Sequence, residues 1–186
     1  MEYRRDQPTG QRLIDPYVPN QVGHSCYEMR MGPEAYVTGR RPESGRSLEK
    51  IKLEEGDQVA IPPGQFALLL AEEKVMNPKE AIGFISIRSS YKIHGLVNVS
   101  GFHVDPGYEG QLLFAVYNAG GNHVVISRGE RVFLMWWASL TDDLDPGYIG
   151  SPLKPCALTD RGCRFRSTSQ DAHRQSHDSA LGRCSG

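Results

Sequence analysis

The chain has 186 residues, of which 39% are hydrophobic, and its net charge is −1. This length suits one domain with a sizeable core. The near-neutral charge gives no field that would attract nucleic acid or a membrane surface, so we expect neither as a partner. No apolar run reaches the length of about 18 residues that a transmembrane helix needs. The N-terminus also lacks an apolar leader core, so a cytoplasmic protein is expected.

Four cysteines are present, at Cys26, Cys156, Cys163 and Cys184. They form no CxxC pair, and no set of cysteines and histidines has the spacing of zinc ligands. Reduced thiols are the rule for a cytosolic chain. We therefore predict free cysteines and no metal bound by protein ligands.

Composition divides the chain into three zones. Residues 1–20 are polar and contain three prolines, which predicts an extended N-terminal arm. Residues 21–150 hold nearly all the apolar runs and form the predicted β domain. Residues 151–186 are rich in Ser, Arg, His and Asp. Such a segment buries too little surface to offset its ordering entropy, so we predict a divergent, flexible C-terminal tail.

Short apolar runs bounded by turn residues predict an all-β sandwich or barrel. The predicted strands are residues 25–30, 35–38, 58–61, 66–71, 81–87, 97–99, 103–104, 110–118, 123–126 and 132–138. Residues 66–70 and 132–137 are continuously apolar, so we expect both faces of these strands to be covered by another sheet or another subunit. Trp136 and Trp137 would point to opposite faces of their strand. Single helical turns are expected at 78–81 and 11–14.

Arg88, Ser89 and Ser90 stand together at the end of a predicted strand. A fork-shaped guanidinium beside two hydroxyls suits a polyphosphate, and Lys92 adds another donor. The alternative is a surface strand end with capping serines.

A second polar element is the sequence Asp105-Pro106-Gly107-Tyr108. Asp-Pro-Gly is typical of a tight turn, with Pro at its second position and Gly where a positive φ is needed. Asp105 could accept a hydrogen bond from a sugar hydroxyl or hold a water, with Tyr108 packed against the sugar ring. An ordinary hairpin turn is the alternative.

Together these elements resemble the dCTP deaminase branch of the dCTP deaminase/dUTPase family. The pattern R-S-S-x4-G followed by (V/I)-D-P-G-(Y/F/W)-x-G-x7-N is matched at Arg88, Ser89, Ser90, Gly95, Val104, Asp105, Pro106, Gly107, Tyr108, Gly110 and Asn118. Residues 25–32 resemble an early strand of the family, with Glu28 where aspartate is usual. Residues 61–68 and 127–133 resemble a strand entry and a late turn of the family.

The resemblance implies a distorted jelly-roll of the dUTPase type, assembled as a homotrimer with active sites between subunits. It also implies a pyrimidine deoxynucleoside triphosphate that carries Mg²⁺ on its phosphates, and deamination without zinc. Asp105 and Ser89 are the candidate catalytic residues, and Asp105 would bind the 3′-hydroxyl. The implied substrate-binding residues are Arg88, Ser89, Ser90, Lys92, Gly101, Asp105, Tyr108, Leu113, Phe114, Ala115 and Tyr148.

Two departures from the family pattern leave three activities open. Ala115 stands where the deaminases have their acid/base glutamate, and its methyl group cannot transfer a proton. Ile93 replaces a family arginine five residues after Arg88. The resemblance favours a dCTP deaminase. An apolar residue at position 115 is instead typical of dUTP diphosphatases, in which Asp105 would hold the attacking water. A nucleotide-binding trimer without catalysis is the third possibility.

Overall fold

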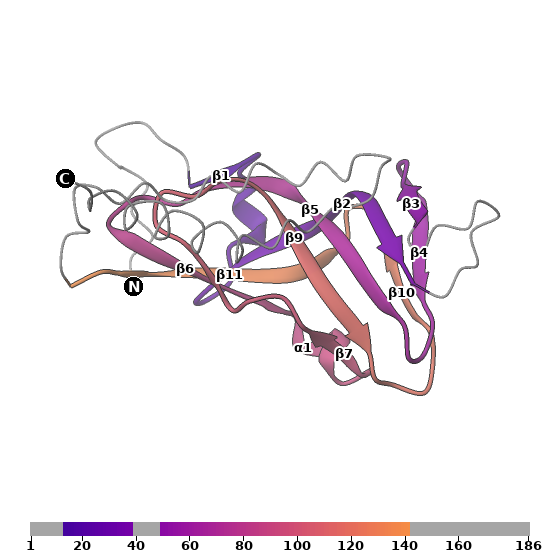
Figure 1. Ribbon diagram of the computed structural model, residues 1–186. Helices are drawn as coiled ribbons and strands as arrows, with labels where there is room; N and C mark the ends of the chain where they lie inside the picture. Colours follow the sequence, from indigo (N-terminus) through magenta and orange to yellow (C-terminus); the bar gives the residue numbers. More distant parts are fainter. Residues whose placement is uncertain (1–12, 39–48, 142–186) are drawn as a thin grey trace, which may run out of the picture.

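The computed structural model describes residues 13–38 and 49–141. Its elements are antiparallel strands with two short helical turns (Figure 1). They are β1 (Ile14–Asp15), η1 (Pro19–Gln21), β2 (Tyr27–Val37), β3 (Glu49–Lys52), β4 (Gln58–Ile61), β5 (Phe66–Met76), β6 (Ala81–Ile87), α1 (Ser89–Lys92), β7 (Leu96–Asn98), β8 (His103–Val104), β9 (Glu109–Asn118), β10 (Val124–Ser127) and β11 (Arg131–Ser139).

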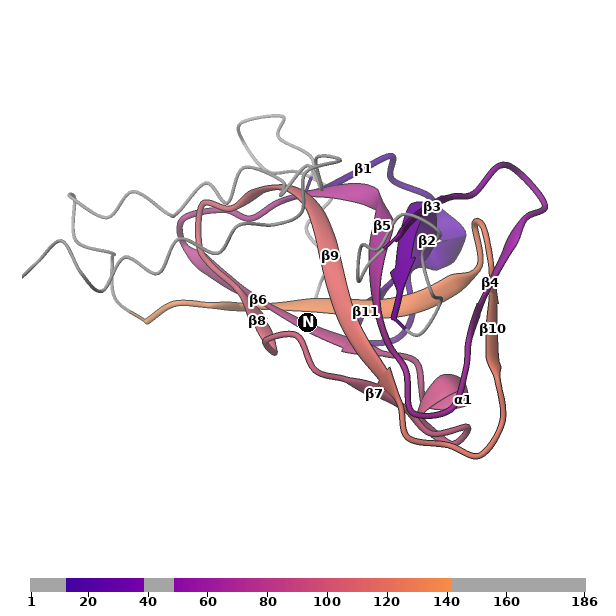
Figure 2. The ribbon, with the colours of Figure 1, turned by 45° about the vertical axis from the view of Figure 1, so that its right-hand side comes forward.

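One curled sheet of nine strands forms the body of the described part (Figure 2). Its order is β7-β9-β5-β2-β11-β6-β8, with β1 added to β5 and β3 to β2, while β10 and β4 pair separately. The two edge strands, β7 and β8, are consecutive in the chain. The connection between them bridges both edges, since Val99 N–H donates to Ala115 O and Ile85 N–H donates to Phe102 O. The sheet thus curls into a half-barrel, and the all-β prediction is confirmed.

The core lies inside the curl because side chains alternate across each strand. Phe114 and Val116 on β9 point inward and are fully buried. Phe133 on β11 also points inward and is fully buried. The rings of Phe114 and Phe133 stack with centroids 4.0 Å apart. This contact joins strands from opposite parts of the sheet.

Part of the outer face of the sheet carries aromatic side chains that are partly exposed. On β6, β11 and the β7–β8 connection, the Phe84 ring stacks on Trp136 and on Phe102, with centroids 5.8 Å and 6.4 Å apart. Phe102 is 67% exposed and Trp136 is 37% exposed. We call Phe84, Phe102 and Trp136 the aromatic face. Trp137 points the other way and packs against the core, as the alternation predicted.

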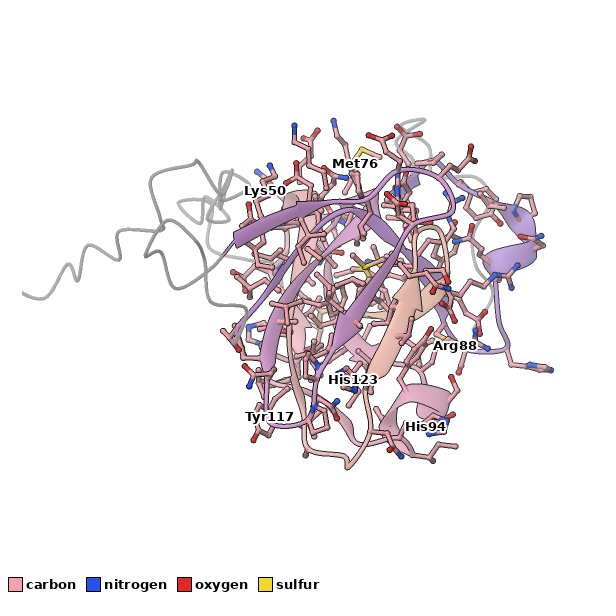
Figure 3. The ribbon with its side chains drawn as sticks, turned by 90° about the vertical axis from the view of Figure 1, so that its right-hand side faces the viewer. Lys50, Met76, Arg88, His94, Tyr117 and His123 are labelled. Carbon is pink, nitrogen blue, oxygen red and sulfur yellow. The ribbon has the colours of Figure 1, made fainter. Side chains whose placement is uncertain are left out.

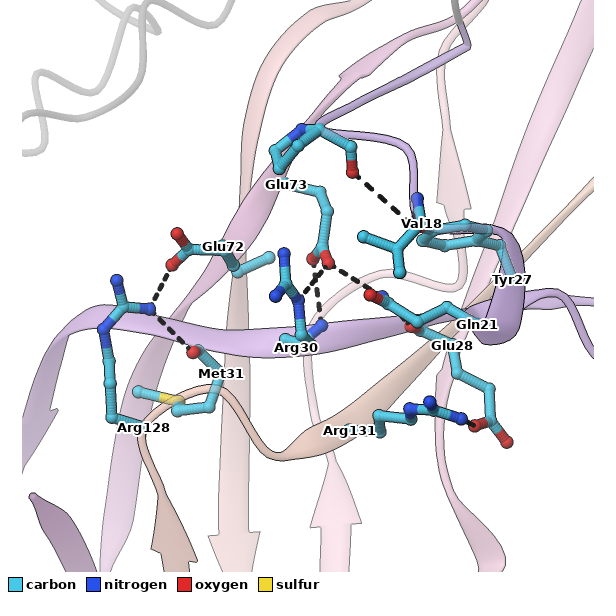
Figure 4. A network of polar contacts seen from close by, with 12 residues as sticks. Val18, Gln21, Tyr27, Glu28, Arg30, Met31, Glu72, Glu73, Arg128 and Arg131 are labelled. Atoms are coloured by element: carbon cyan, nitrogen blue, oxygen red, sulfur yellow. Dashed lines mark hydrogen bonds and ion pairs between the residues drawn. The ribbon is translucent and has the colours of Figure 1, made fainter. Parts of the chain in front are cut away.

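A buried carboxylate ties the start of the described chain to the sheet (Figure 4). Glu73, on β5, is fully buried. It accepts hydrogen bonds from the backbone N–H and Nε of Arg30 on β2, both at 2.9 Å. It also accepts one from Gln21 Nε2 in η1, at 2.9 Å. A buried charge is tolerated when it is paired and hydrogen-bonded in this way.

The predicted strands were confirmed, with differences at the ends of several of them. The two strands predicted at 25–30 and 35–38 are parts of one strand, β2 (Tyr27–Val37), which runs through Gly32. A Cβ there would lie 2.6 Å from Leu70 O, so only glycine allows this approach to β5. The short strands β1 and β3 were not predicted. The single turn expected at 78–81 is present as a hydrogen-bonded turn, in which Ala81 N–H donates to Pro78 O at 3.3 Å, and it is not part of a helix.

The domain boundaries are described only in part. Residues 13–20 of the predicted arm lie against the sheet, where Ile14 pairs with Val75. Residues 1–12 and the predicted tail at 151–186 lie outside the described residues. Cys26 is a free thiol, and the other three cysteines lie in the tail. In the part of the chain that the structure describes, no helix is long and apolar enough to cross a membrane.

Candidate active site

The Arg-Ser-Ser element lies where β6 ends and α1 begins (Figure 3). The backbone N–H of Arg88 donates to Val132 O at 2.9 Å, which holds this strand end against β11. Ser89 and Ser90 are exposed on the helical turn. Lys92 is exposed as well, and its Nζ donates to Ser86 Oγ at 2.8 Å. The four predicted donors therefore gather on one open surface.

One glutamate orients two arginines beside this element. Glu28 Oε1 lies 3.5 Å from Arg88 Nε, and its Oε2 lies 3.3 Å from Arg131 Nη1. Arg88 Nη1 also donates to Arg131 O at 3.4 Å. Two guanidinium groups thus share one carboxylate, and their side chains remain 38% and 36% exposed. The excess positive charge and the free N–H groups suit an anionic ligand.

Two neighbouring groups are held in their neutral forms. Burial raises the pKa of the Cys26 thiol, the Glu28 carboxylate raises it further, and Arg88 opposes the rise. Burial also raises the pKa of the Tyr91 phenol, and the Glu130 carboxylate adds to that rise. Neither group contributes negative charge near neutral pH, so the positive character of the surface is kept.

Asp105 lies in the turn between β8 and β9. Tyr108 N–H donates to Asp105 O at 3.2 Å, and Gly107 has the positive φ of 74° that the Asp-Pro-Gly pattern predicted. The Asp105 carboxylate is accessible, and His103 Nε2 lies 3.4 Å from its Oδ1. Tyr108 is only 8% exposed, and its hydroxyl donates to Gln111 O at 2.8 Å. That burial leaves little of the ring for the predicted contact with a sugar.

The three residues predicted to edge the base pocket lie on two faces of β9. Leu113 and Ala115 point outward, opposite Leu70 and Leu68 of β5. Phe114 points into the core, where it is fully buried, so its side chain cannot edge a pocket on the outer face. The prediction took three consecutive residues together, although alternate residues of a strand face opposite ways.

The connection between β7 and β8 runs beside Ala115. Ala115 O accepts hydrogen bonds from the N–H groups of Val99 and Ser100, at 2.8 Å and 3.1 Å. Gly101 follows and is exposed, and a Cβ on it would meet nothing within 4 Å. Its backbone is therefore open to a ligand or a water. Tyr148 lies outside the described residues.

Glu109 lies too far along β9 to act at the position of Ala115 within the same chain. It pairs with Met76, whereas Ala115 pairs with Leu68. The six residues between them span about 20 Å of strand. The outer face around Ala115 is instead formed by leucines.

The candidate residues form two groups at opposite ends of β6. Val104 pairs with Gly83, so Asp105 lies near the start of β6, and Arg88 follows its end. These ends are about 20 Å apart, because each strand residue advances the chain by about 3.3 Å. Figure 1 shows α1 at the end of β6 away from the β5–β6 connection. Within one chain, Arg88 and Ser89 therefore lie in one group and His103 and Asp105 in the other. The two groups remain apart.

Sequence reasoning gave no role to Arg131 or His103. Arg131 reaches Glu28 only because β11 pairs with β2, which is a long-range contact. His103 is the first residue of β8 and lies two residues before Asp105, so their closeness was visible in the sequence.

Comparison with known proteins identifies the family. Residues 1–140 match the family model described as dCTP deaminase-like. The chain belongs to the dCTP deaminase-like family. Its relatives include the dCTP deaminase of Thermococcus gammatolerans, 33% identical over 139 residues, which make up 75% of this chain and 82% of that protein. The dCTP deaminase of Pyrococcus horikoshii is 32% identical over 139 residues, covering 75% of this chain and 83% of the relative.

A solved structure has the same fold. The 2′-deoxycytidine 5′-triphosphate deaminase of Agrobacterium tumefaciens superposes with a TM-score of 0.56 and 16% sequence identity. The match covers 69% of this chain and 44% of that one, so this chain spans less than half the length of that protein.

The Cys26 thiol offers a test of the local charge arrangement. We expect alkylation of Cys26 at pH 8 to be slower than that of an unfolded cysteine, because burial and Glu28 raise its pKa and so reduce the thiolate fraction. Arg88→Ala should slow it further, because the opposing positive charge is lost. Peptide mapping by mass spectrometry would separate Cys26 from the tail cysteines. Equal rates in both proteins would contradict the placement of Arg88.

Proposed function

We propose that this protein is a dCTP deaminase-like hydrolase of pyrimidine deoxynucleotide metabolism, which converts dCTP and water to dUTP and ammonia without zinc. The observation that carries the proposal is the pair of polar groups at the two ends of β6, in a chain of the dCTP deaminase-like family. One group is cationic and suits a triphosphate. The other offers an accessible carboxylate that suits a sugar hydroxyl.

The proposed binding roles follow from the chemistry of each group. Arg88, Ser89, Ser90 and Lys92 would bind the triphosphate, and Asp105 would accept a hydrogen bond from the 3′-hydroxyl. The backbone near Gly101, with Leu113 and Ala115, would contact the base. The side chains of Arg88, Ser89, Ser90 and Lys92 are cations and hydroxyls. They suit the oxygens of a phosphate and would not bind a bare metal cation. Mg²⁺ would therefore be coordinated by the triphosphate itself, whose charge it partly neutralises.

The distance between the two polar groups supports a homotrimer with shared sites. About 20 Å of strand separates Arg88 from the start of β6 beside Asp105, so the two polar groups of one chain lie far apart for a single nucleotide to contact both. A site completed by a second copy would remove this difficulty. The aromatic face offers an apolar surface for such a copy, because exposed aromatic side chains in contact with one another are typical of protein interfaces.

Ala115 gives a specific reason to keep a second activity. In deamination, water attacks C4 of cytosine and a proton must reach the departing nitrogen. The open backbone near Gly101 would help position this water, but Ala115 cannot shuttle the proton. Hydrolysis of dUTP to dUMP and pyrophosphate needs no acid/base group at position 115, because Asp105 would hold a water that attacks phosphorus. A trimer that only binds nucleotide would have lost both reactions.

Product analysis would decide between these activities. We expect the purified full-length protein with Mg²⁺ to release ammonia from dCTP slowly, because loss of a general acid/base costs about 10²–10⁴ in rate. Pyrophosphate from dUTP, abolished by Asp105→Asn, would establish the diphosphatase instead. No turnover with either substrate, together with a higher melting temperature in the presence of one nucleotide, would indicate a protein that binds nucleotide without catalysis.

Restoring the glutamate tests the role of Ala115 directly. We expect Ala115→Glu to raise the rate of dCTP deamination by about 10²-fold or more, because it returns a proton carrier to the outer face of β9. Ala115→Gln introduces a side chain of nearly the same size as glutamate but without the acid, so it serves as the matched control. If the glutamate variant binds dCTP normally yet deaminates no faster than the glutamine variant, the missing acid/base group is not what limits the reaction.

The assembly can be tested on the aromatic face. We expect the wild-type protein to sediment as a trimer, and Trp136→Arg to shift it toward monomer, because a charge buried in an apolar interface is costly. Val125→Arg changes another exposed apolar residue, on β10, and should leave the trimer intact. A wild-type monomer at micromolar concentration would contradict the proposed assembly.

A further inference from the structure

A buried amide holds the turn that carries Asp105. Asn77 follows β5 and is only 6% exposed. Its Nδ2 donates to Val104 O at 2.8 Å and to Asp105 O at 3.0 Å. Its main chain is bound to the same turn, because Asn77 N–H donates to Tyr108 O and Gly107 N–H donates to Asn77 O, at 2.8 Å and 3.1 Å. Residue 77 thus holds the turn along its whole length.

The orientation of this amide is set by Trp137. The indole Nε1–H of Trp137 donates to Asn77 Oδ1 at 2.5 Å. Because an indole nitrogen can only donate, the amide oxygen must face it. The NH₂ group of Asn77 then has to face the two carbonyls of the turn. Trp137 therefore selects the amide orientation in which both hydrogen bonds to the turn can form.

Glycine at position 83 makes room for this bridge. Trp137, Gly83 and Val104 lie opposite one another on the adjacent strands β11, β6 and β8. A Cβ on Gly83 would lie 3.1 Å from both polar atoms of the Asn77 amide, and 2.6 Å from Met135 Cε. The missing side chain on the middle strand lets one amide connect a residue of β11 to the backbone beyond β8.

We propose that Asn77 and Trp137 are positioning residues for Asp105, and that through this turn they set how well the protein recognises a 3′-hydroxyl. Neither residue needs to touch the nucleotide. Asn77 fixes the backbone at Val104 and Asp105, and the carboxylate direction follows from that backbone. The inference rests on the proposed function, in which Asp105 accepts a hydrogen bond from the 3′-hydroxyl.

Two variants would loosen the turn in different ways. Asn77→Asp keeps the size of the side chain and the acceptor for Trp137, but turns a carboxylate oxygen toward the carbonyls of Val104 and Asp105. Trp137→Phe keeps an aromatic ring and removes only the donor that orients Asn77, so its effect should be smaller and in the same direction.

Asn118 supplies a matched control at the far end of β9. Like Asn77 it is buried, and its Nδ2 also donates to two carbonyls, Ile61 O and Asn122 O, both at 2.8 Å. Its Oδ1 accepts from Gly120 N–H at 2.9 Å. Asn118→Asp therefore places the same chemical change in the same kind of environment, away from Asp105.

The first measurement needs no nucleotide. Hydrogen exchange of peptides covering residues 103–109 should be about tenfold faster in Asn77→Asp, since the turn loses the two amide hydrogen bonds that hold the carbonyls of Val104 and Asp105, and its own N–H groups then open more often. Asn118→Asp should accelerate exchange around residues 118–122 and leave 103–109 unchanged. Unchanged exchange of 103–109 in both Asn77→Asp and Trp137→Phe would overturn the proposal.

The second measurement compares dCTP with 2′,3′-dideoxy-CTP, each titrated with Mg²⁺ into the full-length protein by calorimetry. The wild type and Asn118→Asp should prefer dCTP by about tenfold, and Asn77→Asp should lose most of that preference. A wild type without preference would refute the role proposed for Asp105, while hydrogen exchange still decides whether Asn77 holds the turn. A preference fully kept in Asn77→Asp would overturn the inference itself.

Discussion

The two-residue period of the β-strand decides which side chains can meet a ligand and which form the core. It turns Phe114 inward against Phe133 and leaves Ala115 outside on the same strand. It also separates Trp136, on the aromatic face, from Trp137, which points inward to Asn77. Because the sheet curls and its two edge strands are joined, every inward position contributes to one continuous core. Any functional site then has to be built from outward positions, turns and strand ends.

That constraint explains why the polar groups of this protein lie at the ends of β6. Arg88 follows the strand, and Asp105 lies beside its start, so neither interrupts the core. Each is held by residues from other strands. Glu28 on β2 orients Arg88, and Asn77 after β5 holds the turn of Asp105. The two supports differ in kind, since one is a partly exposed ion pair and the other a buried set of neutral hydrogen bonds. Buried hydrogen bonds fix geometry more firmly than exposed ion pairs do.

Ala115 shows how the family fold and its chemistry can be separated. The residue lies on a regular strand, with a leucine as its cross-strand partner, and its carbonyl anchors the adjacent connection as any residue's would. An outward side chain at this position can therefore change without disturbing the sheet. The proposed deamination needs a proton carrier, and the methyl group of Ala115 does not supply one.

Much of this protein was determined by local sequence. Alternation and turn residues predicted most strands, and Asp-Pro-Gly predicted the turn at Gly107, because these depend on the preferences of neighbouring residues. The motif around Arg88 and Asp105 pointed to the family in the same way. Only the tertiary structure brought Glu28 to Arg88 and Arg131, and Asn77 to Trp137 and Asp105. These contacts join residues far apart in the chain, and they depend on strand order and on the space left at Gly83, which no local pattern specifies.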